Sequence, residues 1–254
     1  MFDVELRDTS QEYPIFRVEN KERLNDMLRR DSGNTTQPTT DAEKPEFMET
    51  EVIQEEADTQ EIPVPESQNF KIMDFRLGEG GPKAKFRMNM NAIVILKQIE
   101  SEGRVATPEE QEILSQYVGW GGIPDAFEPK KEDWAKEYKE LDNALTPEEY
   151  ASARLSTLNS HYTSPIVIQA IYQAITRMGF KSGRILEPAC GIGNFFGLLP
   201  ETMSQSKLYG VELDDISGRI AKLLYPKADI KISGYEKADL QKDFFDLAIG
   251  NVPF

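Results

Sequence analysis

The sequence predicts an α/β fold in its C-terminal part, preceded by a small helical module and an acidic N-terminal stretch. After about residue 159, short apolar runs alternate with helical patterns, which is typical of parallel strands joined by helices. A glycine-rich turn follows the first apolar run. Earlier residues carry helix-start signals without this alternation. We therefore expect residues 159–254 to form a Rossmann-like α/β fold with about four parallel strands.

The charge of −15 is unevenly spread along the chain. Residues 1–70 carry 18 acidic and 7 basic side chains, against 26 and 22 in residues 71–254. Phosphate contacts need Lys and Arg, so a DNA-binding surface should be local or lie on polypeptide beyond this sequence. One cysteine, Cys190, excludes an internal disulfide, and with the single His161 it argues against a metal site.

The sequence has no apolar run long enough for a membrane span and no secretory signal at its start. We expect a cytoplasmic protein. Residues 1–30 mix apolar and charged positions and suit a short strand followed by a helix around 21–30. Residues 31–69 are rich in Thr, Pro, Glu and Asp. Such a segment buries too little apolar surface to fold, so we expect an acidic, flexible linker.

Residues 70–158 read as the helical module. A glycine-rich loop is expected at 78–82, and apolar residues at helical spacing predict a helix over 89–103. Thr107 and Thr146 are each followed by Pro-Glu-Glu, which predicts an N-cap, a first-turn proline and acids at the positive end of the helix dipole. A Gly-Trp-Gly-Gly loop holds Trp120. We favour packing of this tryptophan over a contact with DNA or a partner.

The elements expected in the α/β part follow in order. A helix should begin at Ser164 and run to Met178, where Gly179 ends it. A second helix should run from Ser217 to Tyr225, stopped by Pro226. The four expected strands are 184–186, 207–211, 230–232 and 245–249.

The first candidate site is the run Glu-Pro-Ala-Cys-Gly-Ile-Gly-Asn at residues 187–194, directly after the first strand. Glycines at a strand-to-helix turn let the backbone approach a ligand, and the Glu187 carboxylate can hold a cationic amine. The spacing differs from the dinucleotide fingerprint. This combination favours a zwitterionic cofactor that carries a nucleoside, although a plain glycine turn is the alternative. Cys190 is interpreted as a small packed residue.

Glu212 ends the second strand, 19 residues after Gly193. In α/β nucleoside-binding proteins an acid at this position accepts hydrogen bonds from two ribose hydroxyls. The alternative is a solvated loop acid. Asp214 and Asp215 are interpreted as charges at a helix N-terminus. After the third strand, Tyr235 or Glu236 is expected either to contact the adenine or to lie on the surface.

These motifs, followed by Asn251-Val252-Pro253-Phe254 after the fourth strand, resemble the amino-methyltransferases, whose last motif is usually Asn/Asp-Pro-Pro-Tyr/Phe. Residues 161–165 resemble the Tyr-Thr-Pro motif of the γ-type order, with an extra Ser. The resemblance implies an S-adenosylmethionine-dependent methyltransferase fold, of which residues 159–254 would form the N-terminal half, with S-adenosylmethionine as cofactor. It assigns cofactor binding to Tyr162, Thr163, Glu187, Pro188, Gly191, Gly193, Asn194, Glu212 and Glu236.

The same resemblance assigns the chemistry to residues 251–254. The side-chain oxygen of Asn251 and the carbonyl of Val252 would accept the two N–H bonds of an exocyclic amine and expose its lone pair. Phe254 would stack on an extruded base. Pro253 completes the motif. Val252 stands where the family usually has proline. Valine in this position makes the backbone less rigid but keeps the carbonyl.

More closely, residues 70–254 resemble the start of the large methylase–helicase proteins of conjugative elements and phages. This implies methylation of adenine in DNA within a longer protein, with DNA contacts mostly on regions absent here and a helicase region following. We expect this sequence alone to be inactive. The alternatives are methylation of a protein glutamine, or a non-catalytic cofactor-binding module in defence against restriction. The DNA recognition sequence does not follow from these residues.

Overall fold

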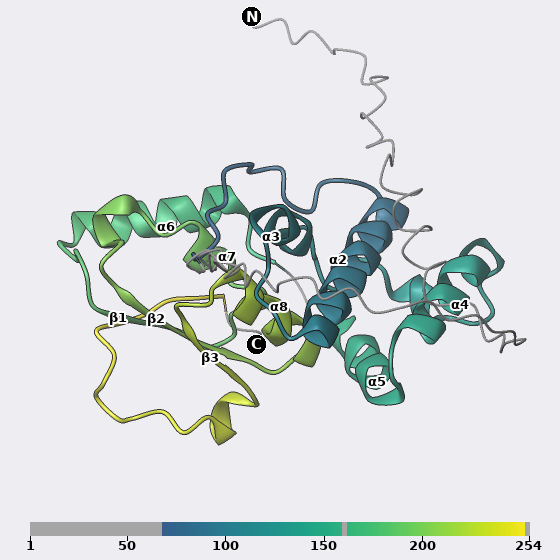
Figure 1. Ribbon diagram of the computed structural model, residues 1–254. Helices are drawn as coiled ribbons and strands as arrows, with labels where there is room; N and C mark the ends of the chain where they lie inside the picture. The colour runs from purple at the N-terminus through teal and green to yellow at the C-terminus, as the bar shows by residue number, and fades with distance from the viewer. Residues whose placement is uncertain (1–67, 159–161, 252–254) are drawn as a thin grey trace, which may run out of the picture. The chain divides into compact units, whose positions relative to one another are not determined.

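The computed structural model describes residues 68–158 and 162–251 (Figure 1). All of these residues belong to one compact unit. The strand and helix expected within residues 1–30, and the linker up to residue 67, lie outside the described residues. The same holds for His161 and for the predicted catalytic residues Val252, Pro253 and Phe254.

The sheet has four parallel strands in the order β3-β2-β1-β4. They are β1 (Arg184–Glu187), β2 (Lys207–Glu212), β3 (Asp229–Ile232) and β4 (Leu247–Ala248). This order is that of the first strands of a classic doubly wound sheet, in which the chain reverses direction across the sheet between the first and fourth strands. The α/β, Rossmann-like fold class expected from the sequence is therefore confirmed.

The fourth strand is shorter than predicted. Only Leu247 and Ala248 pair with β1, instead of the five residues expected. Phe245, the first residue of the predicted strand, and Phe244 just before it pack edge-on against the Tyr209 ring. Their rings thus pack beside the sheet, and regular pairing begins only after them.

The parallel register brings the carboxyl ends of the strands to one edge of the sheet. Glu187, the last residue of β1, is in register with Gly210, and Glu212, the last residue of β2, is in register with Ile232. The next residue after β3, Ser233, donates its backbone N–H to the carbonyl of Glu212 at 2.8 Å. The predicted acids and the loop after β3 therefore meet at one edge.

Helix α8 (Asp215–Leu224) packs on β2 and β3, and the helices of the preceding region pack on α8. These are α2 (Pro82–Glu102), α3 (Pro108–Ser115) and α5 (Pro147–Ser156), which Figure 1 shows beside α8. Helix α4 (Ala135–Ala144) contacts α2. None of the described helices is long and apolar enough to cross a lipid bilayer.

Helix α6 (Pro165–Arg177) precedes β1 and ends close to the predicted position. The hydroxyl of Tyr172 on α6 donates a hydrogen bond of 2.8 Å to the carbonyl of Phe195 in the short helix α7 (Asn194–Gly197). Four short 3-10 helices complete the described elements: η1 (Pro124–Phe127), η2 (Glu132–Trp134), η3 (Glu201–Met203) and η4 (Tyr235–Lys237).

The helix starts follow the local sequence signals. Thr107 and Thr146 are N-caps, as predicted, and each also forms a capping box with the glutamate three residues later. Asp214 accepts a hydrogen bond from the backbone of Ser217 and so caps α8, in agreement with its interpretation as a helix-terminal charge. Helix α2 begins earlier than expected, because Gly81 is extended and Pro82 occupies the first helical position.

The Gly-Trp-Gly-Gly loop packs into the core. Trp120 is fully buried and makes edge contacts with the rings of Phe86, Tyr117 and Phe127. The Asn89 side chain fixes the start of this loop. Its Nδ2 donates to the carbonyl of Gly119 at 2.6 Å, and its Oδ1 accepts from the backbone N–H of Val118 at 2.9 Å. The packed interpretation of Trp120 is confirmed.

The last two residues of the expected linker are described and hydrogen-bonded. The carbonyl of Gln68 accepts from the side chain of Gln111, and the side chain of Asn69 accepts from the backbone of Lys227. The next residue, Phe70, donates its backbone N–H to the carbonyl of Leu224 at 2.7 Å. The packed part of the chain therefore includes residues 68 and 69.

Candidate functional site

A cavity of about 970 Å³ lies at the carboxyl edge of the sheet. Its walls come from the loops after β1, β2, β3 and β4, from the start of α8, from helix α5 and from the segment before α6. Ligands of open α/β sheets bind at this edge, near the point where the strand order reverses. The position of the cavity thus agrees with the general rule for such folds.

The cavity brings together most of the residues singled out in the sequence. Of those within the described ranges, all except Gly193 line it: Tyr162, Thr163, Glu187, Pro188, Gly191, Asn194, Glu212, Glu236 and Asn251. They come from five separate segments of the chain. The parallel topology is what gathers them in one place.

Gly193 lies behind the turn and does not line the cavity. It has a positive φ of 86°, and a Cβ there would meet the Tyr225 ring at 2.5 Å. Its role is therefore to let the turn pack on the core. Gly191 faces the site: its φ is 56°, and a Cβ there would meet the Tyr162 ring at 2.8 Å. The Tyr162 ring and the Gly191 backbone form one side of the cavity.

Glu187 is a buried carboxylate with an unsatisfied oxygen. Its side chain is 3% exposed, and Oε2 has no hydrogen-bond partner among the described residues. Burial, and to a lesser extent the nearby Glu212, raises the pKa of Glu187 well above its usual range. A buried polar atom without a partner is costly, so this oxygen is suited to a ligand that donates a hydrogen bond or carries a positive charge.

Glu212 is held by the backbone around it. Oε2 accepts from the N–H of Gly191 at 2.6 Å, and Oε1 accepts from the N–H of Asp214 at 2.8 Å. Burial raises the pKa of Glu212, while these two backbone bonds act in the opposite direction. The backbone thus orients the side chain, and because a carboxylate has about four acceptor sites, it can still accept from hydroxyls of a ligand in the cavity.

A polar chain runs along the wall of the cavity from helix α5 to helix α8. The Ser152 hydroxyl donates to Oδ1 of Asp214 at 3.1 Å, and the hydroxyl of Ser217 donates to Oδ2 of the same residue at 2.6 Å. The hydroxyls of Tyr162 and Ser217 lie 3.2 Å apart. Asp214 therefore joins the helix cap, the cavity wall and helix α5.

Cys190 is packed rather than reactive. It is 4% exposed, a Cβ at Gly210 would lie 2.9 Å from its sulfur, and burial raises its thiol pKa. Raising the pKa suppresses the thiolate, which is the nucleophilic form. The interpretation of Cys190 as a small packed residue is confirmed.

Sequence reasoning missed part of the wall. Helix α5 contributes Ser152, Leu155 and Ser156, and the loops after β2 and β3 contribute Leu213, Ser233 and Gly234. The loop residues adjoin predicted positions, so the same motif spacing could have included them. No local signal marks the α5 residues, because they reach the cavity only through tertiary packing.

The charge of the lining selects among ligands. Glu187, Glu212, Asp214 and Glu236 line the cavity, and the described residues that line it include no Lys or Arg. A pyrophosphate would lack the positive groups or the phosphate-binding glycine pattern that such ligands use. A cationic or zwitterionic nucleoside suits this lining. Within residues 68–158 and 162–251, no group of three or more His, Cys, Asp or Glu could hold a metal ion.

Comparison with known proteins gives one relative and one solved structure. No protein-family model matches the chain. The chain is 25% identical, over 179 residues and 70% of its length, to Defense against restriction protein B of Escherichia phage P1. It spans about 6% of that curated relative's length. A putative class I S-adenosylmethionine-dependent methyltransferase from Listeria monocytogenes aligns over 68% of this chain and 58% of its own, at 17% identity and a TM-score of 0.29. The fold assignment rests on the strand order.

Proposed function

We propose that this chain forms the cofactor-binding part of an S-adenosylmethionine-dependent methyltransferase that acts on the exocyclic amine of adenine in DNA. One observation carries the proposal. Glu187, Glu212 and Asn251, which follow or end three neighbouring strands, line a single cavity whose lining, among the residues that the structure describes, is acidic and has no Lys or Arg. A cofactor with a positive sulfonium, an amine and a ribose matches these groups.

Different residues of the cavity would bind different groups of the cofactor. Glu187 would accept the ammonium group, which would satisfy its unpartnered Oε2. Glu212, held in place by the backbone of Gly191, would accept the ribose hydroxyls. Tyr235 and Glu236 lie on the third strand's side and would face the adenine. Tyr162 and Thr163, which also line the cavity, would contact the methionine end of the cofactor.

Asn251 would act on the target amine. When bound, the cofactor supplies a methyl group made electrophilic by the sulfonium. The Asn251 amide oxygen and the Val252 carbonyl would accept the amine's N–H bonds and so direct its lone pair. Phe254 would stack on the extruded base. Positioning of this kind requires no enzyme nucleophile, which agrees with the packed state of Cys190.

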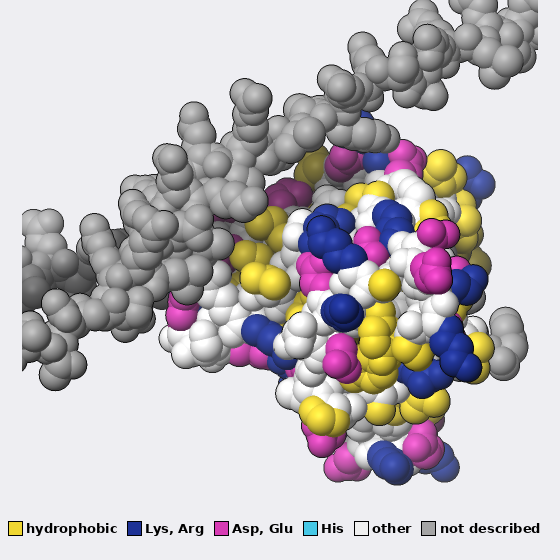
Figure 2. All heavy atoms as spheres, turned by 90° about the vertical axis from the view of Figure 1, so that its right-hand side faces the viewer, with side chains coloured by type: hydrophobic (Ala, Val, Ile, Leu, Met, Phe, Trp, Pro, Cys, Tyr) yellow, Lys and Arg dark blue, Asp and Glu magenta, His cyan; other side chains and the backbone are white. Residues whose placement is uncertain are grey.

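DNA contacts are proposed to come mainly from other regions of the protein, a helicase region among them. The face toward helices α4 and α5 carries Lys and Arg side chains interspersed with Asp and Glu, without a continuous basic surface (Figure 2). Such a mixed surface gives little of the electrostatic attraction that DNA binding needs. Acidic side chains also outnumber basic ones over residues 71–254, by 26 to 22, and we expect this sequence alone to methylate no DNA.

Two measurements test the proposal. Calorimetry with S-adenosylhomocysteine on this chain should show one binding site, and its absence would contradict the cofactor assignment. Transfer of a tritiated methyl group, assayed with the complete natural protein, should label adenine in DNA. Label in protein glutamine would favour the alternative substrate. Transfer to DNA by the 254-residue chain alone would contradict its predicted inactivity.

A second function is favoured by the similarity to Defense against restriction protein B. In that case the chain would be a non-catalytic, cofactor-binding module that protects DNA from restriction. Asn251→Ala in the complete protein separates the two functions. If protection against restriction persists while methyl transfer is lost, the module acts by binding; if both are lost together, methylation is the means.

A further inference from the structure

Helix α5 forms one wall of the cavity although it lies in the helical region ahead of the sheet. Ser152, Leu155 and Ser156 line the cavity from this helix. Leu155 is 73% exposed, and so is an apolar side chain that faces the cavity without cover from the described residues. Single exposed leucines are common on protein surfaces. What distinguishes Leu155 from the equally exposed Leu158 is that only Leu155 lines the cavity.

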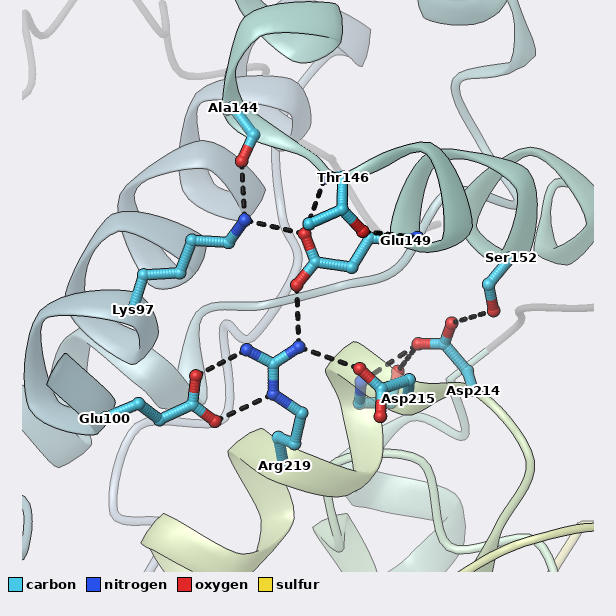
Figure 3. A network of polar contacts seen from close by, with 10 residues as sticks. Lys97, Glu100, Ala144, Thr146, Glu149, Ser152, Asp214, Asp215 and Arg219 are labelled. Carbon is cyan, nitrogen blue, oxygen red and sulfur yellow. Dashed lines mark hydrogen bonds and ion pairs between the residues drawn. The ribbon is translucent and has the colours of Figure 1, made fainter. Parts of the chain in front are cut away.

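The helix is held in place by a network of charged groups (Figure 3). Glu149, in the first turn of α5, accepts hydrogen bonds from Nζ of Lys97 on α2 at 2.6 Å and from Nη1 of Arg219 on α8 at 2.7 Å. Arg219 also bonds Glu100 on α2 and Asp215 on α8. Because three helices share this network, the wall has a defined position before any ligand binds.

The hydrogen bond from Ser152 to Asp214 holds helix α5 against the loop that follows β2. Asp214 follows Glu212 by two residues, and its backbone N–H donates to the carboxylate of Glu212, which also accepts from the backbone N–H of Gly191. Asp214 in turn accepts from the Ser152 hydroxyl. Helix α5 is therefore linked to the part of the cavity wall that lies at the carboxyl end of β2. Leu155 is three residues further along the same helix, on the face that lines the cavity.

We propose that helix α5 is part of the cofactor site and that Leu155 covers the nucleoside of the bound cofactor. This inference rests on the proposed function, because it requires an S-adenosyl ligand in the cavity. The apolar side chain of Leu155 would be covered by the adenosine when the ligand binds, and removing it from water would strengthen binding. The helical region thus takes part in cofactor binding in addition to supporting the sheet.

The test compares two leucines on this 254-residue chain. Leu155→Ala should weaken the binding of S-adenosylhomocysteine by about fivefold to tenfold, since the variant loses part of an apolar contact. Leu158→Ala removes the same group from a position with 78% exposure that does not line the cavity, and should leave affinity within about twofold. Leu155→Met, which keeps the volume, should retain most of the affinity. Thermal unfolding should be nearly the same for all four proteins.

The outcomes separate the inference from the function on which it rests. If the wild-type chain does not bind S-adenosylhomocysteine, the proposed function is overturned and the inference with it. If the wild type binds and Leu155→Ala binds equally well, only the inference is overturned. Binding of adenosine, measured by competition, locates the contact. Leu155→Ala should lower the affinity for adenosine by a similar factor, and a lower affinity for S-adenosylhomocysteine alone would contradict the contact with the nucleoside.

Discussion

The carboxylate of Glu149 and the guanidinium of Arg219 are joined by a hydrogen bond of 2.7 Å between Oε1 and Nη1, across 70 positions of the sequence. The other oxygen of Glu149 accepts from Lys97 and from the backbone of Thr146, which makes the same side chain part of the helix cap. Glu149 is 8% exposed. A buried charge with this many partners fixes the position of its helix, and losing the charge leaves the partners unsatisfied.

Glu149→Gln should therefore destabilise the fold. Burial alone would raise the pKa of Glu149, but the bonds from Lys97 and Arg219 lower it to about 2. Because the folded pKa is depressed, the stabilisation is present above the unfolded pKa of 4.5 and is lost as pH falls toward 2. We expect a loss of about 2–4 kcal/mol at pH 7, measured by urea unfolding, and a smaller difference from wild type near pH 3.

Glu148→Gln is the matched control for this variant. Glu148 precedes Glu149 in the same helix turn and is exposed. Its removal should cost at most about 0.5 kcal/mol, through the helix dipole. Equal unfolding midpoints for the two variants would show that the network does not hold helix α5. Glu149→Gln should also weaken S-adenosylhomocysteine binding, because the α5 wall would lose its fixed position.

Glu187→Gln should separate stability from binding. Burial raises the folded pKa of Glu187, so between pH 4.5 and that raised pKa the folded chain holds a proton that the unfolded chain has released. Wild-type stability should consequently fall as pH rises through this window, and the glutamine variant should lack this decline. At pH 8 the variant should melt at the same temperature as wild type or higher, yet bind S-adenosylhomocysteine at least about tenfold more weakly, since it cannot pair with an ammonium. Unchanged affinity would remove Glu187 from the cofactor site.

Three glycines with positive φ give a graded series: Gly191 and Gly193 in the turn after β1, and Gly103 at the end of helix α2. Gly103→Ala introduces a side chain at φ 61° with no atom within 4 Å, so it should cost only the backbone strain of about 1–2 kcal/mol. Gly191→Ala adds contact with the Tyr162 ring and should weaken S-adenosylhomocysteine binding beyond this control. Gly193→Ala would collide with Tyr225 and should mainly lower stability. Urea unfolding and calorimetry on the three variants test this order, and equal binding by the Gly103 and Gly191 variants would contradict it.

Asn251→Ala should abolish chemistry while sparing cofactor binding. Asn251 is exposed at the cavity, so the substitution should not disturb the fold. We expect methyl transfer by the complete protein to fall about 100-fold or more, by analogy with removal of a single transition-state hydrogen-bonding group. Affinity for S-adenosylhomocysteine should stay within about threefold. Asn143→Ala, at an exposed asparagine on α4 that does not line the cavity, serves as control. Retained transfer by the Asn251 variant would place the reaction elsewhere.

The sheet and the core of the site could be predicted because their signals are local. The ends of β1 and β2 follow from short apolar runs bounded by Glu187 and Glu212, and both capping boxes are readable from four residues each. Parallel topology then determines that acids at strand ends share one edge. Convergence of Glu187, Glu212 and Asn251 thus required no knowledge of side-chain packing.

The rest depends on contacts between distant parts of the sequence. The Asn89 side chain holds a loop 30 residues away, and Ser152 reaches Asp214 across 62 residues. Neither contact leaves a periodic signal in the sequence. The early start of α2 at Pro82 could have been predicted, since proline is favoured at the first helical position. The shortening of β4 could not, because it depends on ring packing between Phe245 and Tyr209.

Helix α5 also limits where this chain can be joined to a related one without loss of the pocket. A hybrid gene joined just ahead of Ser164 would inherit every strand and the whole glycine turn, yet its pocket would be open on the side that Ser152 and Leu155 occupy. Lys97 and Glu100 would be missing from the anchor of that side as well. An exchange that keeps the cavity intact should therefore move the segment from residue 68 onward as a single block.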